Sequence, residues 1–490
     1  MSNMRVDVPS SRRLTESALM ALAASMAMPG AAQTPTDRPA PPAFVDEQGE
    51  EVFGPGYLPD SPDDAGEPLR VGRPTAGFQV SPAAGTRLQA ELAEAAGQQA
   101  RRPAFDAFPI ADLPLRRSVR RSLDLPPWNG SRRVAPPVPA GAGAGSGQAG
   151  RQEMRVHFVY VGQGAGAILE FPCGVAVIDT GGEFGSKASD GGQLFVDYLD
   201  RFFAARPALN RTIDVLFTSH PHMDHLYGLS RIFPRVGPPR YTVRNIVDNG
   251  QTGTTGSLGA QSEARAAARA AGAGYSAVEL RNQVTATGST NTVIDPFRCT
   301  GVDPVITAFW GSRNEALRID TQALVRQYRT PNNHSLVLRV DFGKASFLFP
   351  GDLQKEGATD LMAEYADNQA AFDIDVLQVS HHGADNGTSD ALLRFTSPKI
   401  AIISMGDRSA TGRGSAFDHG HPRISAIRMM QEAPAIVSQS RPRRIYWAAD
   451  KQEAPFRKVA ITRAIHATGW EGTLVVTART DGTYAVAPAR

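Results

Sequence analysis

The residues most able to do chemistry lie in one short stretch, Thr-Ser-His-Pro-His-Met-Asp-His, at residues 218–225. Its spacing, His-x-His-x-Asp-His, places four potential metal ligands within six residues: His220, His222, Asp224 and His225. Neutral imidazoles and carboxylates are the groups that divalent zinc takes, at about 2.0–2.2 Å. Such crowding would have no structural purpose in a solvated loop. The stretch therefore predicts a metal site.

The elements on either side must position this cluster. The apolar run 213–217 before it predicts a buried strand, and residues 226–233 after it could open a helix. Other candidate ligands also lie where predicted strands begin or end: His334, Asp352, His381, His382, His419 and His421. Adjacent strands lie about 5 Å apart, so these side chains can converge. Two metal ions about 3.5–4 Å apart would find enough ligands here, including a bridging carboxylate.

A folded region begins at Met154 and alternates strands with helices. The strands predicted by apolar and β-branched runs are 156–161, 167–171, 175–179, 213–217, 304–310, 335–341, 346–349, 373–379, 400–404, 444–447 and 474–477. Helical spacing predicts helices around Phe195 to Phe202, at 262–271, from Leu353, at 389–395 and at 423–433. The pattern predicts an α+β domain over 154–490, with two sheets sandwiched by helices. The insertion 249–303 is expected to form one wall of the site.

The first 153 residues have a different composition. In residues 1–33, an Arg pair precedes a short apolar stretch and then small residues near Ala32, which is the order of a secretory signal. The alternative is a disordered N-terminus. Residues 34–153 are rich in Pro, Gly and Arg, with a Gly/Ala/Ser linker at 140–150 and one possible helix at 85–100. We expect this segment to be largely irregular, as a solvated linker or as a docking arm for an acidic surface or nucleic acid.

Whole-chain properties narrow the function only slightly. The 490 residues carry 51 basic and 49 acidic side chains, which gives no support for a nucleic-acid or membrane-surface partner. No apolar run reaches transmembrane length, so no membrane span is expected. Cys173 and Cys299 could pair in an oxidising space. A secretory signal would place the protein in the periplasm or outside the cell, and otherwise it is cytoplasmic. The oligomeric state is left open.

Six motifs together carry a resemblance to a known family. They are Val161-Gly162-Gln163-Gly164, Ile178-Asp179-Thr180-Gly181-Gly182, Ser219 to His225, Asn332-Asn333-His334-Ser335-Leu336-Val337, Gly351-Asp352 and Ser380-His381-His382-Gly383. In this order they resemble the metallo-β-lactamase fold, a four-layer αβ/βα sandwich. More narrowly, they are similar to the metallo-hydrolase domain of the bacterial competence DNA-uptake channel, but without the membrane channel.

The resemblance implies a ligand set for two metal ions. His220, His222 and His334 would hold the first ion, Asp224, His225 and His382 the second, and Asp352 would bridge the two. The native ions would be Zn²⁺, with Mn²⁺ as an alternative.

The resemblance also implies roles for residues around the ions. Asp224 would orient the attacking water, His381 would orient the substrate, and His421 would face it. The roles of His381 and His382 could be exchanged. Asp179 would brace the cluster without binding metal, whereas His419 is expected to be an ordinary polar residue.

Such a site predicts a hydrolase. Two metal ions lower the pKa of a bridging water toward 7 and so supply hydroxide at neutral pH. The leading interpretation is hydrolysis of a phosphodiester, by a nuclease or another phosphodiesterase, with nucleic acid as a possible partner. The alternatives are hydrolysis of a small-molecule lactone, amide or ester, and a non-catalytic binding protein on the same scaffold.

Overall fold

The computed structural model describes residues 152–489, except 183–189, 280–286, 314–327 and 433–435. Three predictions therefore lie outside the described residues: the secretory signal over 1–33, the helix at 85–100 and, apart from its last two positions, the irregular segment over 34–153. The first strand begins at Glu153.

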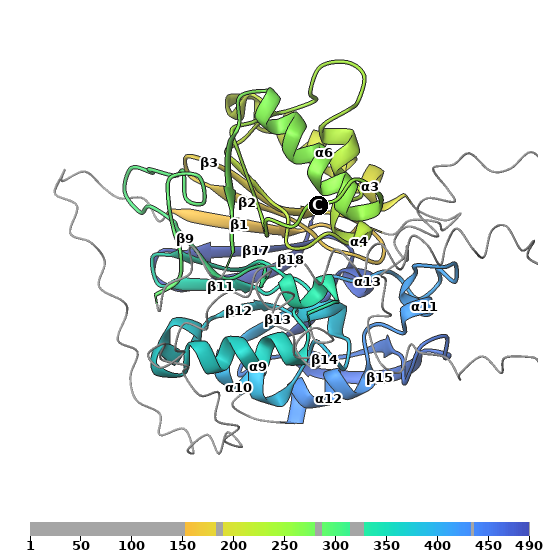
Figure 1. Cartoon of the computed structure of the whole chain (residues 1–490). Coiled ribbons are helices and arrows are strands. Elements are labelled where there is room, and N and C mark those ends of the chain that lie inside the picture. The colour runs from red at the N-terminus through yellow and green to blue at the C-terminus, as the bar shows by residue number, and fades with distance from the viewer. Residues whose placement is uncertain (1–151, 183–189, 280–286, 314–327, 433–435, 490) are drawn as a thin grey trace, which may run out of the picture. The chain divides into compact units, whose positions relative to one another are not determined.

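Two β-sheets form the centre of the described region (Figure 1). The first has the order β18-β17-β1-β2-β3-β5-β7-β8. Its strands are β1 (Glu153–Phe158), β2 (Gly166–Phe171), β3 (Gly174–Thr180), β5 (Val215–Phe217), β7 (Asn245–Asp248), β8 (Gly274–Ala277), β17 (Leu474–Arg479) and β18 (Tyr484–Pro488). The strands from β3 to β8 are parallel neighbours, and the others pair antiparallel. The chain thus returns at its end to pair β17 with β1.

The second sheet has the order β16-β13-β12-β11-β10-β9. Its strands are β9 (Val305–Trp310), β10 (Val337–Phe342), β11 (Ala345–Phe349), β12 (Val376–Gln378), β13 (Ile400–Ile403) and β16 (Ile465–Ala467). The strands from β11 to β16 are parallel neighbours, and β9, β10 and β11 pair antiparallel. Two small ribbons pair β4 (Thr212–Ile213) with β6 (Thr242–Val243), and β14 (Ser440–Ala448) with β15 (Arg457–Arg463).

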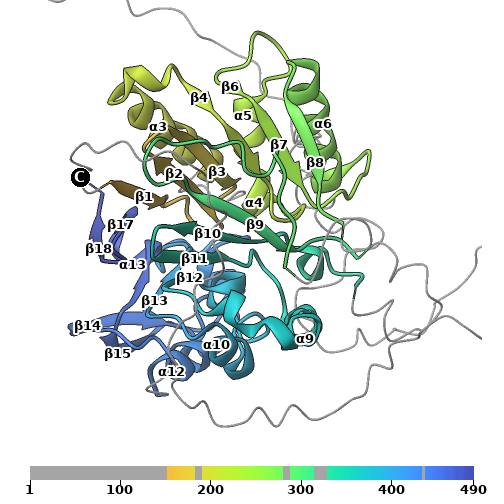
Figure 2. The ribbon, with the colours of Figure 1, turned by 90° about the vertical axis from the view of Figure 1, so that its left-hand side faces the viewer.

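Helices cover the outer face of each sheet, as Figure 2 shows from a second direction. The helices α3 (Gly191–Ala204) and α6 (Gly256–Ala270) lie on the first sheet, near the short α4 (Met223–Leu226) and α5 (Leu229–Ile232). The helices α9 (Lys355–Glu364), α10 (Asp390–Thr396) and α12 (Ile424–Glu432) lie on the second. Shorter helices are α11 (Ala416–His419) and α13 (Thr468–Glu471). The predicted αβ/βα sandwich is confirmed.

Strand β3 shows why its sequence is apolar without interruption. Val175 and Val177 belong to the apolar cluster beneath α3, whereas Ala176 and Ile178 belong to the cluster between the two sheets. A strand with both faces covered has no position for a solvated side chain. Phe195 of α3 belongs to the same apolar cluster as Val175 and Val177 and is fully buried. The helix predicted around Phe195 to Phe202 is confirmed.

The structure also contains strands that the sequence patterns did not predict: β6, β7, β8, β15, β16 and β18. These strands are short or carry Gly, Ser or charged residues, which are depleted in strands, so their local signal is weak. The helix predicted at 262–271 begins earlier, at Gly256. The predicted strand 373–379 is limited to β12.

A disulfide joins Cys173 to Cys299, with their Cα atoms 5.3 Å apart. It connects the turn between β2 and β3 to the segment before β9, across 126 residues of sequence. Within the described ranges, no helix has the length and apolar character needed to cross a membrane.

Candidate metal centre

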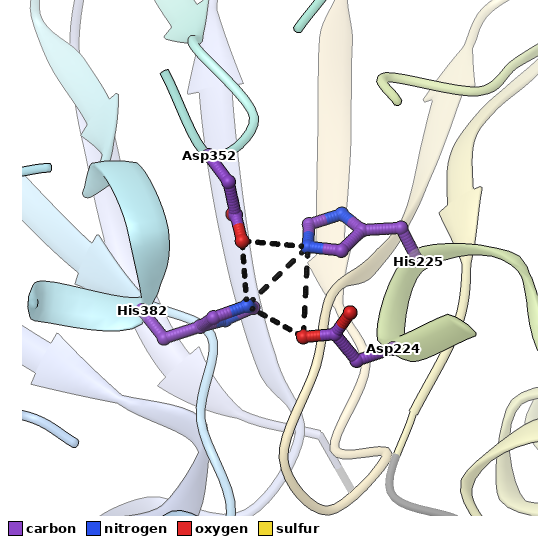
Figure 3. Close-up of side chains that lie close together, drawn as sticks. All are labelled: Asp224, His225, Asp352 and His382. Carbon is purple, nitrogen blue, oxygen red and sulfur yellow. Dashed lines mark hydrogen bonds and ion pairs between the residues drawn. The ribbon is translucent and has the colours of Figure 1, made fainter. Parts of the chain in front are cut away.

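Strand ends from both sheets deliver four side chains to one point (Figure 3). Asp224 and His225 lie on α4, shortly after β5 of the first sheet. Asp352 follows β11, and His382 lies in a 3₁₀ turn, Ser380–Gly383, after β12 of the second sheet. One ligand atom from each residue lies within 4.8 Å of the others. The site thus forms at the carboxyl ends of strands, where α/β folds commonly bind ligands.

The carboxylate of Asp352 lies at the centre of this group. Its Oδ2 atom is 3.2 Å from Nε2 of His225 and 3.2 Å from Nε2 of His382. Nε2 of His382 is also 3.1 Å from Oδ2 of Asp224. The two Nε2 atoms, of His225 and His382, are 3.3 Å apart. Four electron-rich atoms therefore face a common point.

Hydrogen bonds on the far side of each ring fix the position of its proton. Nδ1 of His225 donates to Oδ2 of Asp179 at 2.8 Å, and Nδ1 of His382 donates to the carbonyl of Ser404 at 2.7 Å. In the neutral rings, Nε2 then carries a lone pair, which is the arrangement that metal-binding histidines use. Two lone pairs facing each other beside two carboxylates require a positive charge between them. The residues present therefore fit a divalent metal ion.

A second group of ring nitrogens lies beside the first, near Asp352. Nε2 of His220 is 3.1 Å from Nδ1 of His222 and 3.9 Å from Oδ2 of Asp352. Oγ of Ser219 donates to Asp179 and so accepts from Nδ1 of His220 at 3.0 Å, which leaves the lone pair of His220 on Nε2. Nε2 of His222 is buried and has no hydrogen-bond partner among the described residues. A second ion would give these nitrogens a partner.

The shifts in pKa show how strongly the site attracts positive charge. Burial lowers the pKa of His382, but the carboxylates of Asp352 and Asp224 outweigh burial and raise it to about 10. Burial raises the pKa of Asp352, but His225 and His382 bring it well below its usual range. Burial and the neighbouring histidines hold the pKa of His220 well below its usual range. The carboxylates thus favour positive charge at this point, and a bound metal ion would supply that charge in place of ring protons.

Unusual backbone positions aim these side chains. Asp179, His381 and His382 have φ values of 56°, 50° and 54°. This is the left-handed region of backbone conformation, which residues other than glycine rarely adopt. Residues in such conformations cluster at functional sites, because the surrounding structure must hold them there. Gly181 allows the chain to pass close to α4, since a Cβ at this position would lie 1.9 Å from the carbonyl oxygen of Asp224.

Two further histidines stand beside the four-residue group. The ring of His421 lies 5.4 Å from that of His381 and 5.9 Å from that of His382, between centroids. His381 has its Nδ1 2.6 Å from Oδ1 of Asn386 and its Nε2 3.9 Å from Oδ2 of Asp352. The structure thus brings His382, rather than His381, into the central group. The ring of His419 stacks on His421 at 5.6 Å, farther from the cluster.

The structure does not bring His334 to the cluster. Its Nε2 donates to the carbonyl of Tyr328 at 2.8 Å, and its Nδ1 accepts from the backbone N–H of Arg313 at 3.0 Å. Burial lowers the pKa of His334 to about 4, which keeps the ring neutral, as these two bonds require. Because backbone groups use both nitrogens, His334 lies outside the group around Asp352 in this structure. It ties two backbone segments together.

Residues 169–407 match the family model of the metallo-beta-lactamase superfamily. The chain contains a metallo-β-lactamase-fold domain. The domain is distantly similar to competence proteins. It is 36% identical over 93 residues to ComE operon protein 3 of Bacillus subtilis, which is 19% of this chain and 11% of that protein. It is 42% identical over 78 residues to Recombination protein 2 of Haemophilus influenzae, which is 16% of this chain and 9% of that protein.

Solved structures of low sequence identity are also similar to the metallo-β-lactamase-fold domain. One is a diphosphatase of the PhnP family, with 12% identity and a TM-score of 0.28, covering 64% of this chain and 99% of that chain. Another is the metallo-β-lactamase MIM-2, with 13% identity and a TM-score of 0.24, covering 49% of this chain and 77% of that chain.

Several residues that shape the site of this metallo-β-lactamase-fold domain were not predicted to do so. Ser219 contacts Asp179, His220 and His225 through its hydroxyl. The carbonyl of Ser404 fixes the proton of His382, and the side-chain amide of Gln163 contacts His421. Gln163 lies in one of the recognised motifs, but a motif does not show which side chain its amide will meet. A backbone carbonyl leaves no signal in the sequence.

Proposed function

We propose that the domain is a dinuclear metal-dependent hydrolase that cleaves a phosphodiester. The observation that carries the proposal is the convergence of five side chains around the Asp352 carboxylate. They would hold one ion with His220 and His222 and a second with Asp224, His225 and His382, while Asp352 is shared. Zn²⁺ suits this mixture of imidazoles and carboxylates.

Two ions held in this way would supply hydroxide at neutral pH and would neutralise charge that develops on the substrate. The protein residues hold the geometry. Asp179 fixes the proton of His225 on Nδ1, and Ser404 does the same for His382. Asp224 contributes a carboxylate at the mouth of the site, where its side chain is more exposed than that of Asp352. In this proposal it would orient the attacking water.

Two observations favour a phosphodiester as the substrate. His381 and His421 stand next to the cluster without belonging to its central group, so they can donate hydrogen bonds to phosphate oxygens. Two of the relatives with similar sequences are a recombination protein and a competence protein by name, and recombination acts on DNA, a phosphodiester. The matches span only 9–14% of the lengths of those relatives, so their other properties are not transferred.

A substrate panel tests the proposal. The metal-loaded full chain is assayed on bis-p-nitrophenyl phosphate, single-stranded DNA, a lactone and a cephalosporin. We expect turnover of one or both phosphodiesters. Turnover of only the lactone or only the cephalosporin would contradict the phosphodiester and assign the domain to the other hydrolase class. No turnover of any substrate, with both ions bound, would favour a binding protein.

Removal of the shared carboxylate tests the site itself. Asp352→Ala should bind less than one ion per chain and lose at least about 10³-fold in kcat, because both halves of the centre depend on this group. Metal content by mass spectrometry and the same assay give the two readouts. A matched control is Asp390→Ala, which alters an exposed ion pair with Arg394 on α10. Full activity in Asp352→Ala would place the reaction elsewhere.

We also propose that the protein works outside the cytoplasm. The disulfide between Cys173 and Cys299 supports this location, since such bonds persist in oxidising compartments. Fractionation of cells that express the full chain, with blotting of each fraction, checks it. Recovery only from the reducing cytoplasm, with both thiols free, would contradict the proposal.

A further inference from the structure

His421 is held from behind by a side chain that comes from the opposite half of the domain. Nε2 of Gln163 lies 3.1 Å from Nδ1 of His421, and both residues are buried. Gln163 belongs to the turn between β1 and β2, whereas His421 ends the loop that follows β13. The two residues are 258 positions apart in the sequence.

The orientation of the Gln163 amide follows from a second contact. The backbone N–H of Gly406 donates to Oε1 of Gln163 at 3.3 Å. If the amide were turned over, its NH₂ group would face this N–H, and two donors would meet. Nε2 of Gln163 therefore faces His421 as a donor, because the amide nitrogen has no lone pair available for accepting.

The position of the His421 proton follows in turn. Since Nδ1 accepts from Gln163, it carries no hydrogen, and the ring is neutral with its hydrogen on Nε2. Within the described part of the chain, Nε2 of His421 has no hydrogen-bond partner, although the ring lies 5.4 Å from His381 and 5.9 Å from His382. An N–H group thus remains available beside the metal centre.

Close packing keeps this arrangement in place. A Cβ on Gly406 would lie 2.7 Å from the backbone nitrogen of Gln163, so the start of the loop rests directly on the turn that carries the glutamine. The backbone N–H of His421 also donates to the carbonyl of Ala416 at 2.9 Å. Both partners of the contact are therefore fixed before any substrate arrives, as preorganised catalysis requires.

We propose that Gln163 is a positioning residue that holds His421 in the Nε2–H form, so that His421 presents a neutral hydrogen-bond donor to an oxygen of the phosphodiester. This inference rests on the proposed function for the identity of the substrate. The assignment of the tautomer itself does not depend on it. His421 would then stabilise charge on the substrate without donating a proton and without binding metal.

Nuclear magnetic resonance of the zinc-loaded full chain with ¹⁵N-labelled histidine tests the tautomer directly. The signals of His421 are identified as those that disappear in His421→Ala. We expect a hydrogen-free Nδ1 and a hydrogen-bearing Nε2. In Gln163→Glu, which keeps the acceptor for Gly406 but replaces the donor by a carboxylate oxygen, Nδ1 should gain a hydrogen. A hydrogen on Nδ1 of the unaltered protein, or no change in Gln163→Glu, would overturn the inference.

A double-mutant cycle tests the role in catalysis. Gln163→Met, which keeps the size of the side chain, and His421→Ala should each lower kcat by about 10²-fold, as loss of one preorganised donor does. The double variant should be no slower than His421→Ala, because Gln163 acts through His421. If the losses in kcat of the two single variants multiply in the double variant, the inference is overturned. Metal content and the thermal unfolding midpoint identify a variant that has failed to fold, and Gln163→Leu then takes the place of Gln163→Met.

The two proposals can fail separately. If no phosphodiester is cleaved but the histidine signals change as expected, the proposed function is wrong and the assignment of the tautomer stands. If phosphodiesters are cleaved and Nδ1 of His421 carries the hydrogen, the proposed function stands and Gln163 has only a structural role.

Discussion

At the scale of single residues, the site depends on carboxylates with different tasks. Asp352 faces both groups of histidines, so it can be shared by two ions. Asp179 instead supports the cluster from behind, away from the Nε2 atoms that face Asp352. It accepts from the backbone N–H and the hydroxyl of Ser219 and from Nδ1 of His225. The role predicted for Asp179, bracing the cluster without binding metal, agrees with these contacts.

Asp179→Asn tests this bracing role. The amide keeps the shape of the side chain, but its NH₂ group cannot accept from Ser219 and His225 together. We expect the affinity for metal to fall about 10–100-fold, as it does when the partner of a metal-binding histidine is lost. Competition with a chromophoric chelator measures the affinity, and Asp390→Asn at an exposed ion pair serves as the control. Equal affinities in the two variants would contradict the role.

At the scale of elements, the short helix α4 is held close to the end of β3. The backbone N–H of Ala165 donates to the carbonyl of Asp224 at 3.0 Å, and a Cβ on Gly181 would meet the same carbonyl at 1.9 Å. Since backbone atoms cannot rotate away as a flexible side chain can, only glycine fits at Gly181. The position of two candidate ligands on α4 thus depends on a residue that bears no functional group.

Gly181→Ala should displace α4 and weaken the centre. We expect a loss of roughly 1–3 kcal/mol in stability from overpacking, together with reduced metal content. Thermal unfolding of the metal-free variant measures the first effect, and metal analysis measures the second. A variant that keeps the metal content and the unfolding temperature of the unaltered protein would show that α4 can move without cost.

A second link between elements ties α3 to the first sheet. Glu170 on β2 accepts hydrogen bonds from Arg206, just beyond α3, at 2.5 and 2.9 Å, and lies 3.4 Å from Nε2 of His157 on β1. Burial raises the pKa of Glu170, but His157 and Arg206 outweigh burial and lower it to about 2. A carboxyl whose pKa is lowered by folding stabilises the folded state only while it is ionised.

Glu170→Gln should therefore cost stability in a way that depends on pH. The full contribution of Glu170 is present above its unfolded pKa, near 4.5, and is lost as pH falls toward about 2. At pH 6 we expect the variant to be less stable by roughly 1.5–3 kcal/mol, the value of hydrogen bonds to a charged group. Urea unfolding of both proteins from pH 6 down to pH 3 measures the difference. A difference that does not shrink on acidification would contradict the ionic role.

At the scale of the whole domain, distant parts of the chain are joined across the two sheets. The rings of Phe158 and Phe349 stack between the sheets with centroids 6.0 Å apart, and β17 pairs with β1 although the whole domain separates them in sequence. The disulfide between Cys173 and Cys299 adds a covalent link between the turn after β2 and the segment before β9.

The double substitution Cys173→Ala with Cys299→Ala should lower the free energy of unfolding by about 2–4 kcal/mol, because the open chain gains entropy when unfolded. Activity at 25 °C should remain, since neither cysteine touches the centre. Urea unfolding measures the stability with and without a phosphine reductant, and the double variant itself must not respond to the reductant. Unaltered stability on reduction would show that the link does not constrain the unfolded chain.

Much of this organisation is encoded locally. Two-residue alternation and apolar runs predicted most central strands, because each buried strand must carry its own apolar side chains. The stretch from His220 to His225 predicted a metal site by itself, since its ligands are adjacent in sequence. The motif order further implied Asp352 and His382 as ligands, and the structure brings both to the central group.

Other features were decided only by the tertiary structure. His334 occupies the motif position of a ligand, yet its nitrogens bond to the backbone groups of Tyr328 and Arg313, a result that depends on where those segments lie in space. The contact of Gln163 with His421 depends on two loops that meet across the site. Sequence determines which groups are available and how each segment folds locally. Which nitrogen keeps its proton depends on partners that only packing brings together.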